Sequence, residues 1–158
     1  MPSLRLPATD GRPVDLSALP GVTVVYAYPR TSPPDAPPLP GWDLIPGARG
    51  CTPQSCAFRD HFGELRAAGF DQVFGLSTQG TAYQREAAER LHLPFALLSD
   101  ADLALADALA LPRFTAAGMV LLCRLTMLLQ NGVVRNVFCP VLDPAGNAEA
   151  VLDSLKAG

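Results

Sequence analysis

The feature of this chain that most constrains its fold is an alternation of short apolar runs with segments of helical spacing. β-Branched and aromatic residues fill residues 22–28, which is typical of a central strand. Helical spacing follows over residues 53–68, where Phe58, Phe62 and Leu65 fall on one face. Strands that alternate with helices in this way predict an α/β fold with a mixed central sheet and helices on both faces.

The other expected elements continue this alternation. An N-terminal β-hairpin is expected over residues 4–16, with its turn at Asp10-Gly11, and a second hairpin turns at Asn131-Gly132. Further strands are expected at 72–77, 95–98, 119–129 and 133–138, and helices at 81–91, 101–109 and 145–155. No repeat or second composition zone is evident, so we expect one domain over residues 1–158.

A proline-rich segment interrupts the pattern at residues 30–47. Six prolines fall within it, and proline fixes φ and removes a backbone donor, so we expect a loop with polyproline character. Loops of this length in a compact domain are often functional. Trp42, the one tryptophan, is expected to anchor the loop; contact with a substrate or partner is the alternative.

Composition excludes several classes of protein. Apolar residues make up 49% of the chain and charged residues 17%, which is typical of a globular protein. The net charge of -3 and the absence of a Lys/Arg block argue against nucleic-acid binding. No apolar run is long enough for a signal peptide or a membrane span, so we expect a cytoplasmic protein. In a reducing cytoplasm, cysteines are catalytic, metal-binding or buried more often than they form a disulfide framework.

Two cysteines, Cys51 and Cys56, mark a candidate redox site. Both lie near the start of the expected helix, where the positive end of the helix dipole favours a reactive thiolate. A continuous helix would hold their Cα atoms about 8.6 Å apart, beyond the roughly 7 Å limit for a disulfide. A bond between them therefore requires the first turn or two of the helix to unwind. Pro53 favours this, because it contributes no N–H to hold the first turn.

The other candidate residues carry weaker signals. Cys123 lies in an apolar strand and Cys139 follows Phe138 at a strand end, so both are expected to be small buried hydrophobes. A four-cysteine zinc site fits the spacing of the cysteines poorly. A cysteine-protease site would need His61 as the base of Cys51. Arg124 interrupts an apolar run, where a charge is costly unless it is paired or functional. It either faces outward or forms a structural ion pair, or it is a cation held against the thiolate.

Several segments resemble one known family. The chain resembles the peroxiredoxins, most closely the Q type, also called bacterioferritin comigratory protein. The cysteine motif at 50–60 carries most of the resemblance, and the segments 6–17, 24–29, 75–78, 93–100 and 124–126 add to it. The resemblance implies a thioredoxin-like fold and a thiol peroxidase that reduces hydrogen peroxide and organic hydroperoxides.

The resemblance also implies a role for each site residue. Cys51 would attack the peroxide and become a sulfenic acid, and Cys56 would resolve it to an intrachain disulfide. A thioredoxin- or glutaredoxin-like donor would then reduce that disulfide. Arg124 and the N–H groups around Gly50 would stabilise the thiolate and the developing oxygen charge. No metal, haem or flavin is implied, and a monomer is expected, because the resolving cysteine is in the same chain.

The chain departs from the family pattern just before Cys51. The family has a threonine three residues upstream, where this chain has Ala48, and Arg49 replaces the usual proline. Thr31 is a candidate to supply the missing hydroxyl, and Arg49 to compensate with charge. Together with Gly50 and the strand-end Pro29, these residues are the expected substrate-binding set, and the segment 30–47 looks like an insertion.

Two other functions remain open at this point. One is a thiol–disulfide oxidoreductase that uses the same pair, although the usual Cys-x-x-Cys signature is absent. The other is a redox sensor or binding module, in which the cysteine pair changes the shape of the protein and residues 30–47 contact a partner.

Overall fold

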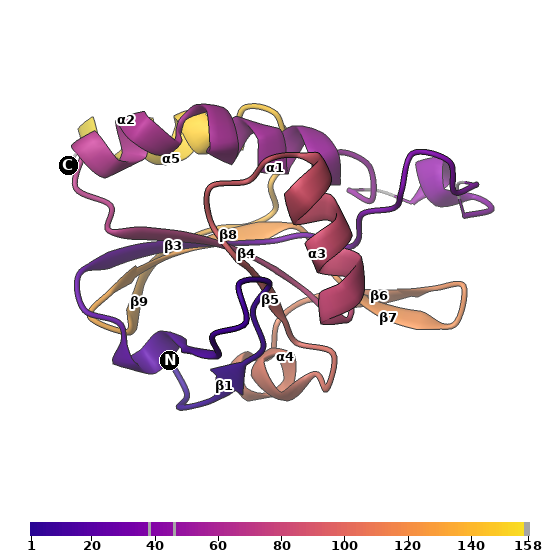
Figure 1. Ribbon diagram of the computed structural model, residues 1–158, viewed down its shortest axis with the longest axis horizontal. Coiled ribbons are helices and arrows are strands. Elements are labelled where there is room, and N and C mark those ends of the chain that lie inside the picture. Colours follow the sequence, from indigo (N-terminus) through magenta and orange to yellow (C-terminus); the bar gives the residue numbers. More distant parts are fainter. Residues whose placement is uncertain (38, 46, 157–158) are drawn as a thin grey trace.

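The computed structural model describes residues 1–37, 39–45 and 47–156, and its centre is a mixed five-stranded sheet (Figure 1). The strands lie in the order β5 (Leu97–Ser99), β4 (Gln72–Ser77), β3 (Val22–Ala27), β8 (Leu125–Gln130) and β9 (Val133–Phe138). β3, β4 and β5 run parallel, whereas β8 and β9 are antiparallel to their neighbours. The expected mixed sheet is confirmed.

Helices cover both faces of this sheet. On one face lie α1 (Cys51–Asp60), α2 (Phe62–Ala67), α3 (Thr81–Arg90) and α5 (Asn147–Lys156). The other face is covered by α4 (Ala104–Leu109), the short helix η1 (Leu16–Ala18) and the N-terminal hairpin of β1 (Arg5–Leu6) and β2 (Val14–Asp15). Figure 1 shows the two layers above and below the strands. The predicted hairpin and the predicted helices on both faces are therefore confirmed.

The two apolar layers arise from the alternation of side chains along the central strands. Val24 and Tyr26 of β3 point into the layer beneath α1 and α5, whereas Val25 and Ala27 point toward α4. All four side chains are fully buried, which is expected of a strand paired on both edges and covered on both faces.

The expected single strand over residues 119–129 is wrong. The chain instead forms β7 (Met119–Leu122), which pairs with β6 (Arg113–Ala116) in a separate two-stranded sheet, and then enters β8. β6 was not expected from the sequence. Cys123 and Arg124 form the break between the two sheets. Arg124 leaves the ladder there because its guanidinium has buried partners on α1 and on the segment before it.

The predicted helix over residues 53–68 is in fact two helices. α1 ends at Asp60, and His61, with φ of -99°, separates it from α2. The other predicted elements are present with ends shifted by a few residues.

The proline-rich segment leaves the body of the molecule at the same end as the β6–β7 hairpin (Figure 1). It contains one short helix, η2 (Trp42–Leu44), and Trp42 packs beside Phe114 of β6 with ring centroids 6.2 Å apart. This contact agrees with the expected anchoring role. Pro38 and Pro46 lie outside the described residues.

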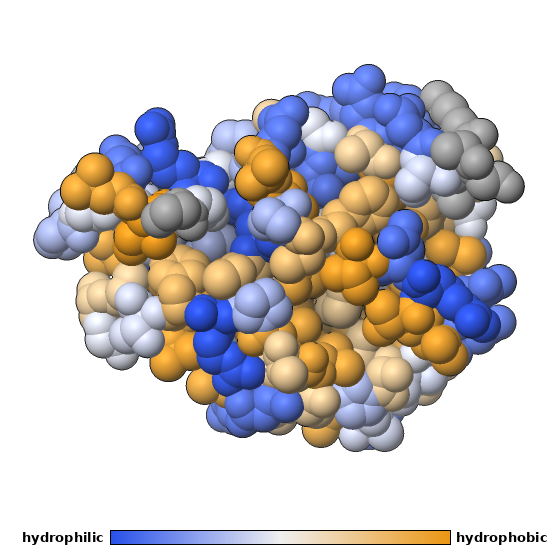
Figure 2. All heavy atoms as spheres, turned by 180° about the vertical axis from the view of Figure 1, so that it is seen from behind, coloured by the Kyte–Doolittle hydropathy of each residue, from blue (hydrophilic) through white to orange (hydrophobic). Residues whose placement is uncertain are grey.

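None of the described helices combines the length and the apolar character that a membrane crossing needs. Some large apolar side chains do remain at the surface, among them Leu44, Val133, Val137 and Leu142. Figure 2 shows apolar side chains gathered across much of the face opposite to that of Figure 1.

Candidate active site

Cys51 is the first residue of α1, and its side chain is only 6% exposed. Gly50 caps the helix in a left-handed conformation with φ of +105°, which a residue with a Cβ rarely adopts. A Cβ at this position would also lie 2.6 Å from Cγ of Pro144. The backbone that delivers Cys51 to the helix start therefore requires glycine for two reasons.

The guanidinium of Arg124 lies directly against the Cys51 sulfur. Its Nη2 donates to Cys51 Sγ at 3.2 Å and to the carbonyl oxygens of Ala48 and Arg49 at 3.2 and 2.9 Å. The Arg124 residue is 3% exposed, and no carboxylate within the described part of the chain forms a salt bridge with it. Arg124 is therefore a buried cation held against the thiol, and it neither faces outward nor belongs to a structural ion pair.

A buried network of amides holds Arg124 in this position. Nη1 of Arg124 donates to Oε1 of Gln54 at 2.6 Å, and Nε2 of Gln54 donates to Oδ1 of Asn147 at 3.0 Å. Thr126 Oγ1 donates to the same Asn147 oxygen at 2.6 Å. The network joins α1, β8 and α5, and all its members are buried.

Sequence reasoning missed Gln54, Thr126 and Asn147. One signal was available for Gln54, because it lies three residues after Cys51 and so on the same side of the helix. Asn147 carried no such signal, since its partners lie 93 and 21 residues away in the sequence.

Aromatic side chains form the floor beneath the start of α1. Tyr26 stacks on Phe58 with ring centroids 4.6 Å apart, and its hydroxyl donates to Ser55 Oγ at 3.0 Å. Burial raises the pKa of both Tyr26 and Tyr28 well above the ordinary value, and a negative charge on Cys51 raises each further. Both phenols therefore stay neutral and present a weakly polar wall to the thiol.

Cys56 lies on the same helix as Cys51, and both thiols are free. Cys56 is half-buried, and α1 is continuous between the two cysteines. This arrangement is the one expected of the reduced protein, because a disulfide requires the first turns to unwind. The unwinding itself stays a prediction.

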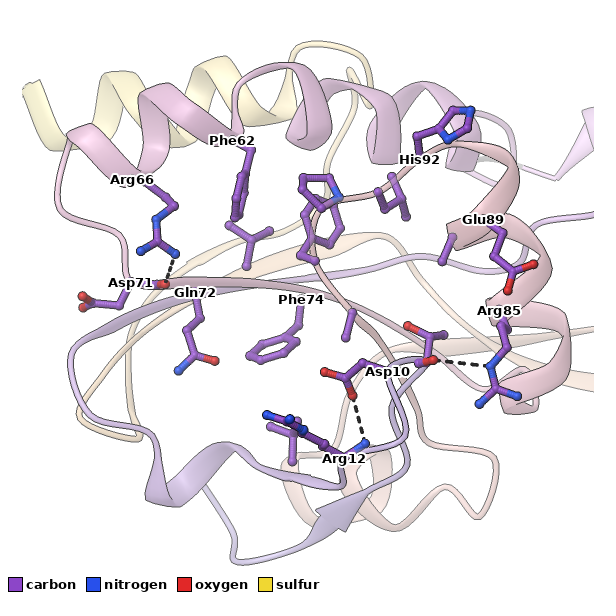
Figure 3. A pocket seen from close by; sticks show the side chains of 18 of the residues that line it. Asp10, Arg12, Phe62, Arg66, Asp71, Gln72, Phe74, Arg85, Glu89 and His92 are labelled. Atoms are coloured by element: carbon purple, nitrogen blue, oxygen red, sulfur yellow. Dashed lines mark hydrogen bonds between the residues drawn. The ribbon is translucent and has the colours of Figure 1, made fainter.

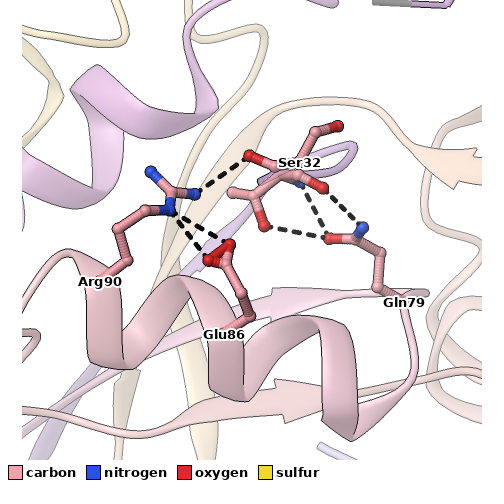
Figure 4. A network of polar contacts seen from close by, with 5 residues as sticks. Ser32, Gln79, Glu86 and Arg90 are labelled. Carbon is pink, nitrogen blue, oxygen red and sulfur yellow. Dashed lines mark hydrogen bonds and ion pairs between the residues drawn. The ribbon is translucent and has the colours of Figure 1, made fainter. Parts of the chain in front are cut away.

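Thr31 does not bring its hydroxyl to Cys51. Its Oγ1 and its backbone N–H both donate to Oε1 of Gln79, at 3.4 and 2.9 Å, and Gln79 Nε2 donates back to the Thr31 carbonyl. Figure 4 shows this network, which also includes Ser32, Glu86 and Arg90. The buried Pro29 directs the chain from the end of β3 toward Gln79, which follows β4, so the hydroxyl expected near the thiol is used elsewhere.

Arg49 also differs from its expected place. Its side chain is 74% exposed and pairs with Asp43 at 3.3 Å, whereas only its carbonyl oxygen contacts Arg124. Ala48 is fully buried at the position where the family has threonine, with its carbonyl oxygen 3.8 Å from Cys51 Sγ. The site is therefore built from one guanidinium, backbone groups and the helix start.

A cavity of about 920 Å³ opens beside this site. Gly50, Pro53 and Arg124 line it together with mainly apolar neighbours, among them Phe114, Val141, Leu142 and Pro144. Cys123 and Cys139 line it as well. The expectation that these two cysteines are buried is wrong: Cys123 is half-exposed and Cys139 is exposed, because both follow the ends of strands at the rim of the cavity.

A second cavity, of about 810 Å³, lies between the N-terminal segment and helices α2 and α3 (Figure 3). It is lined by Asp10, Arg12, Arg66 and Arg85 and by aromatic rings, and contains no cysteine. Arg66 donates to the Asp71 carbonyl and Arg85 to the Thr9 carbonyl, so these cations hold the backbone. Nothing in this cavity resembles the site around Cys51.

Two other kinds of site, a cysteine-protease site and a metal site, lack the necessary side chains among the described residues. Nδ1 of His61 contacts the Ala57 carbonyl at 2.9 Å, and ten residues of helical rise, about 15 Å, separate His61 from Cys51. His61 is therefore not the base of a cysteine-protease site. Within residues 1–37, 39–45 and 47–156, no three His, Cys, Asp or Glu side chains cluster as metal ligands.

The family described as Redoxin matches residues 1–152. The chain belongs to the redoxin family. A peroxiredoxin Q from the chloroplast of Oryza sativa subsp. japonica is 38% identical over 100 residues, which cover 63% of this chain and 39% of that protein. Peroxiredoxin Bcp of Escherichia coli is 38% identical over 102 residues, covering 64% of this chain and 55% of that one. The chain thus aligns with about two-fifths to one-half of these redoxin relatives.

Solved structures of similar redoxins extend over more of the chain. The bacterioferritin comigratory protein of Xanthomonas campestris is 28% identical with a TM-score of 0.77, covering 98% of this chain and 90% of that one. Peroxidoxin BcpB of Mycobacterium tuberculosis is 25% identical with a TM-score of 0.76, covering 98% and 92%. The fold is therefore thioredoxin-like, and the family resemblance noted in the sequence is confirmed.

Proposed function

We propose that this redoxin is a thiol-dependent peroxidase in which Cys51 reduces a hydroperoxide. The observation that carries the proposal is the buried sulfur at a helix start, 3.2 Å from a buried guanidinium. The cation and the positive end of the helix dipole both stabilise a thiolate. A thiolate, unlike a thiol, is an effective nucleophile toward the O–O bond.

In the proposed reaction, the Cys51 thiolate attacks the terminal oxygen of ROOH. The S–O bond forms as the O–O bond breaks, and the alkoxide leaves as ROH after taking up a proton. Arg124 Nη2 already donates toward the sulfur, so it is placed to stabilise the negative charge that moves onto the oxygens. The product on the protein is a Cys51 sulfenic acid.

Cys56 then resolves the sulfenic acid in this proposal. Its thiol attacks the Cys51 sulfur, a disulfide forms and water leaves. A thioredoxin- or glutaredoxin-like dithiol returns both cysteines to thiols by exchange. Such a cycle belongs in a reducing compartment such as the cytoplasm, and it needs no second subunit.

The cavity beside Gly50 and Arg124 favours organic hydroperoxides in addition to hydrogen peroxide. Its lining is mainly apolar, and its volume of about 920 Å³ is in the range of sites for small organic ligands. The similar protein of Xanthomonas campestris is described as having alkyl peroxide reduction activity. That activity, in a relative with the same fold, supports the proposal for this chain.

The decisive experiment adds one equivalent of hydrogen peroxide to the reduced protein, followed by intact mass and peptide mapping. We expect fast loss of two hydrogens, mapped to a Cys51–Cys56 disulfide in samples acid-quenched immediately after oxidation, and turnover when a thioredoxin system is present. Cys51→Ser is the control and should abolish both. Disulfide reductase activity without peroxide consumption would instead favour an oxidoreductase, and stoichiometric oxidation without turnover would favour a sensor.

A further inference from the structure

Cys123 and Cys139 form a second thiol pair on the rim of the cavity beside the active site. Both thiols are free, one half-exposed and one exposed, and both line the same cavity as Gly50, Pro53 and Arg124. The mechanism proposed above uses neither of them.

The sheet register places the two cysteines close together. Thr126 of β8 lies opposite Phe138 of β9, so the next step of the ladder brings Cys139 level with Leu125. Cys123 lies two residues before Leu125, in the break between β7 and β8; burial raises the pKa of its thiol, and Cys139 is near enough that a negative charge there raises this pKa further. A disulfide needs the Cβ atoms about 3.5–4.5 Å apart. Both cysteines lie just beyond the ends of their strands, outside the paired residues of β6–β7 and β8–β9, and the Cys123 N–H donates to the Pro112 carbonyl at 2.9 Å.

The thiols also interact electrostatically. Burial raises the pKa of the Cys123 thiol, and a negative charge on Cys139 raises it further. Cys139, the exposed member, is the thiol that an unwound Cys51–Cys56 disulfide can reach first.

The cavity wall that meets this pair contains the peroxidatic segment. Gly50 and Pro53, on either side of Cys51, line the cavity, and Gly50 packs against Pro144 of the segment that follows Cys139. A Cys51–Cys56 disulfide requires the first turns of α1 to unwind. Unwinding separates the Cys51 sulfur from Arg124 and leaves it between Gly50 and Pro53, which line the cavity.

We propose that Cys139 and Cys123 take over the disulfide from Cys51 and Cys56 by internal exchange. The Cys139 thiolate attacks the Cys51 sulfur, the Cys51–Cys56 bond breaks and Cys56 leaves as a thiolate. Cys123 then attacks the Cys139 sulfur, and Cys51 leaves as a thiolate. The pair is oxidised, Cys51 and Cys56 are reduced and take up the two protons that the pair loses, and no external oxidant is needed. This relay rests on the proposed peroxidase cycle.

The relay has a functional consequence for the choice of reductant. The disulfide moves from a helix whose peroxidatic sulfur is buried to a pair whose Cys139 sulfur is exposed. A dithiol protein donor then meets its target at the surface, and Cys51 returns to its place against Arg124 before that donor arrives.

A titration with hydrogen peroxide in the absence of reductant tests the relay. We expect the reduced protein to consume two equivalents, to lose all four thiols and to contain both disulfides on peptide mapping. Cys139→Ser should consume one equivalent, form only the Cys51–Cys56 disulfide and keep Cys123 free. Consumption of one equivalent by the wild-type chain, with Cys123 and Cys139 still reduced, overturns the relay and leaves the peroxidase proposal intact. No consumption overturns both.

Two further variants separate exchange from direct oxidation of the pair. In Cys123→Ser, acid quenching and mapping should trap a Cys51–Cys139 mixed disulfide. In Cys51→Ser, the pair should stay reduced over the time in which the wild-type chain is fully oxidised. A Cys123–Cys139 disulfide formed at the wild-type rate in Cys51→Ser means that peroxide oxidises the pair directly, and it overturns the relay.

Discussion

At the scale of single residues, the site depends on a cation buried without a carboxylate. Arg124 is held by a sulfur, an amide oxygen and backbone carbonyls, so its charge is not neutralised by another side chain of the described residues. Burying a cation without a carboxylate partner lowers the stability of the fold. The same cation strongly stabilises an anion that forms beside it. In the proposed reaction, Arg124 is therefore placed to stabilise the thiolate and the reacting oxygens.

Replacing Arg124 by glutamine should remove this stabilisation. We expect kcat/KM for hydrogen peroxide to fall by about 10²–10³, the usual loss for one charge-stabilising donor. Stopped-flow kinetics of Cys51 oxidation measures it. Arg135→Gln, on the exposed surface of β9, is the matched control and should change the rate by less than about twofold. A rate for Arg124→Gln equal to that of the control would contradict the role of Arg124.

Gly50 is the second residue on which the site depends. Gly50→Ala should lower the free energy of unfolding by about 1–2 kcal/mol for the left-handed backbone, and by more because of the collision with Pro144. Gly11→Ala separates the two effects, because Gly11 has φ of +84° and a Cβ added there would meet no other atom within 4 Å. Urea unfolding of both variants gives the difference. Equal losses of unfolding free energy in the two variants would mean that Pro144 moves aside without an energetic cost.

At the scale of elements, the proposed cycle couples catalysis to the conformation of α1. Its first turn holds Cys51 against Arg124, whereas the disulfide to Cys56 cannot form within a continuous helix. The proposed cycle therefore requires two states of α1, and Gln54 lies in the turn that would unwind. Unwinding would also break the bond from Gln54 to Arg124.

Oxidation should therefore reduce the helical signal. We expect far-UV circular dichroism to lose the contribution of one to two turns when the Cys51–Cys56 disulfide forms, and to regain it with a dithiol reductant. Cys56→Ser is the control, since its Cys51 oxidises without a disulfide in the helix and its spectrum should not change. An unchanged spectrum in a protein with a mapped Cys51–Cys56 bond would contradict the two-state helix.

The amide network couples α1 to α5 and β8. Asn147→Ala leaves Gln54 and Thr126 with unpaired buried groups, which should lower the free energy of unfolding by about 1–3 kcal/mol. It should also slow Cys51 oxidation several-fold, because Gln54 then orients Arg124 less well. Asn136→Ala, at an exposed position on β9, should cost less than about 0.5 kcal/mol and leave the rate unchanged. Loss of stability without any change in rate would make the network structural only.

At the scale of the whole molecule, the order of strands brings the site together. β8 lies next to β3, with Leu125 opposite Ala27, so Arg124 is delivered beside the end of β3. The proline-rich segment leaves from that same end and returns at Gly50. Cys123 and Cys139 then line one cavity at this end of the sheet with Gly50 and Pro53, which flank Cys51, although the two segments are far apart in the sequence.

An intrachain resolving cysteine needs no second subunit, so we expect a monomer of 16.7 kDa in both redox states. Light scattering after size exclusion, with and without peroxide, measures this. A dimer in the oxidised state that disappears in Cys139→Ser would show instead that the exposed thiol pairs between chains.

Much of this protein was predictable from local patterns. The central strand, the Asn131-Gly132 hairpin and the cysteine pair at a helix start each depend on neighbours within about ten residues, and each is present. The break at Cys123 and Arg124 was not predictable, because an apolar run with one charge looks like a continuous strand. The strand breaks there because the guanidinium of Arg124 bonds to Gln54 and Cys51, which lie at least 70 residues away in the sequence.

The sequence by itself therefore determined the α/β class, the place of Cys51 at the helix start and the presence of an arginine within an apolar run of the same chain. Only the tertiary structure decided that Arg124 contacts Cys51, that Thr31 binds Gln79, that Gln54 and Asn147 support the site, and that Cys123 and Cys139 share its cavity. The physical reason is that periodicity reports local burial, whereas these contacts depend on which strand ends and loops the sheet order brings together.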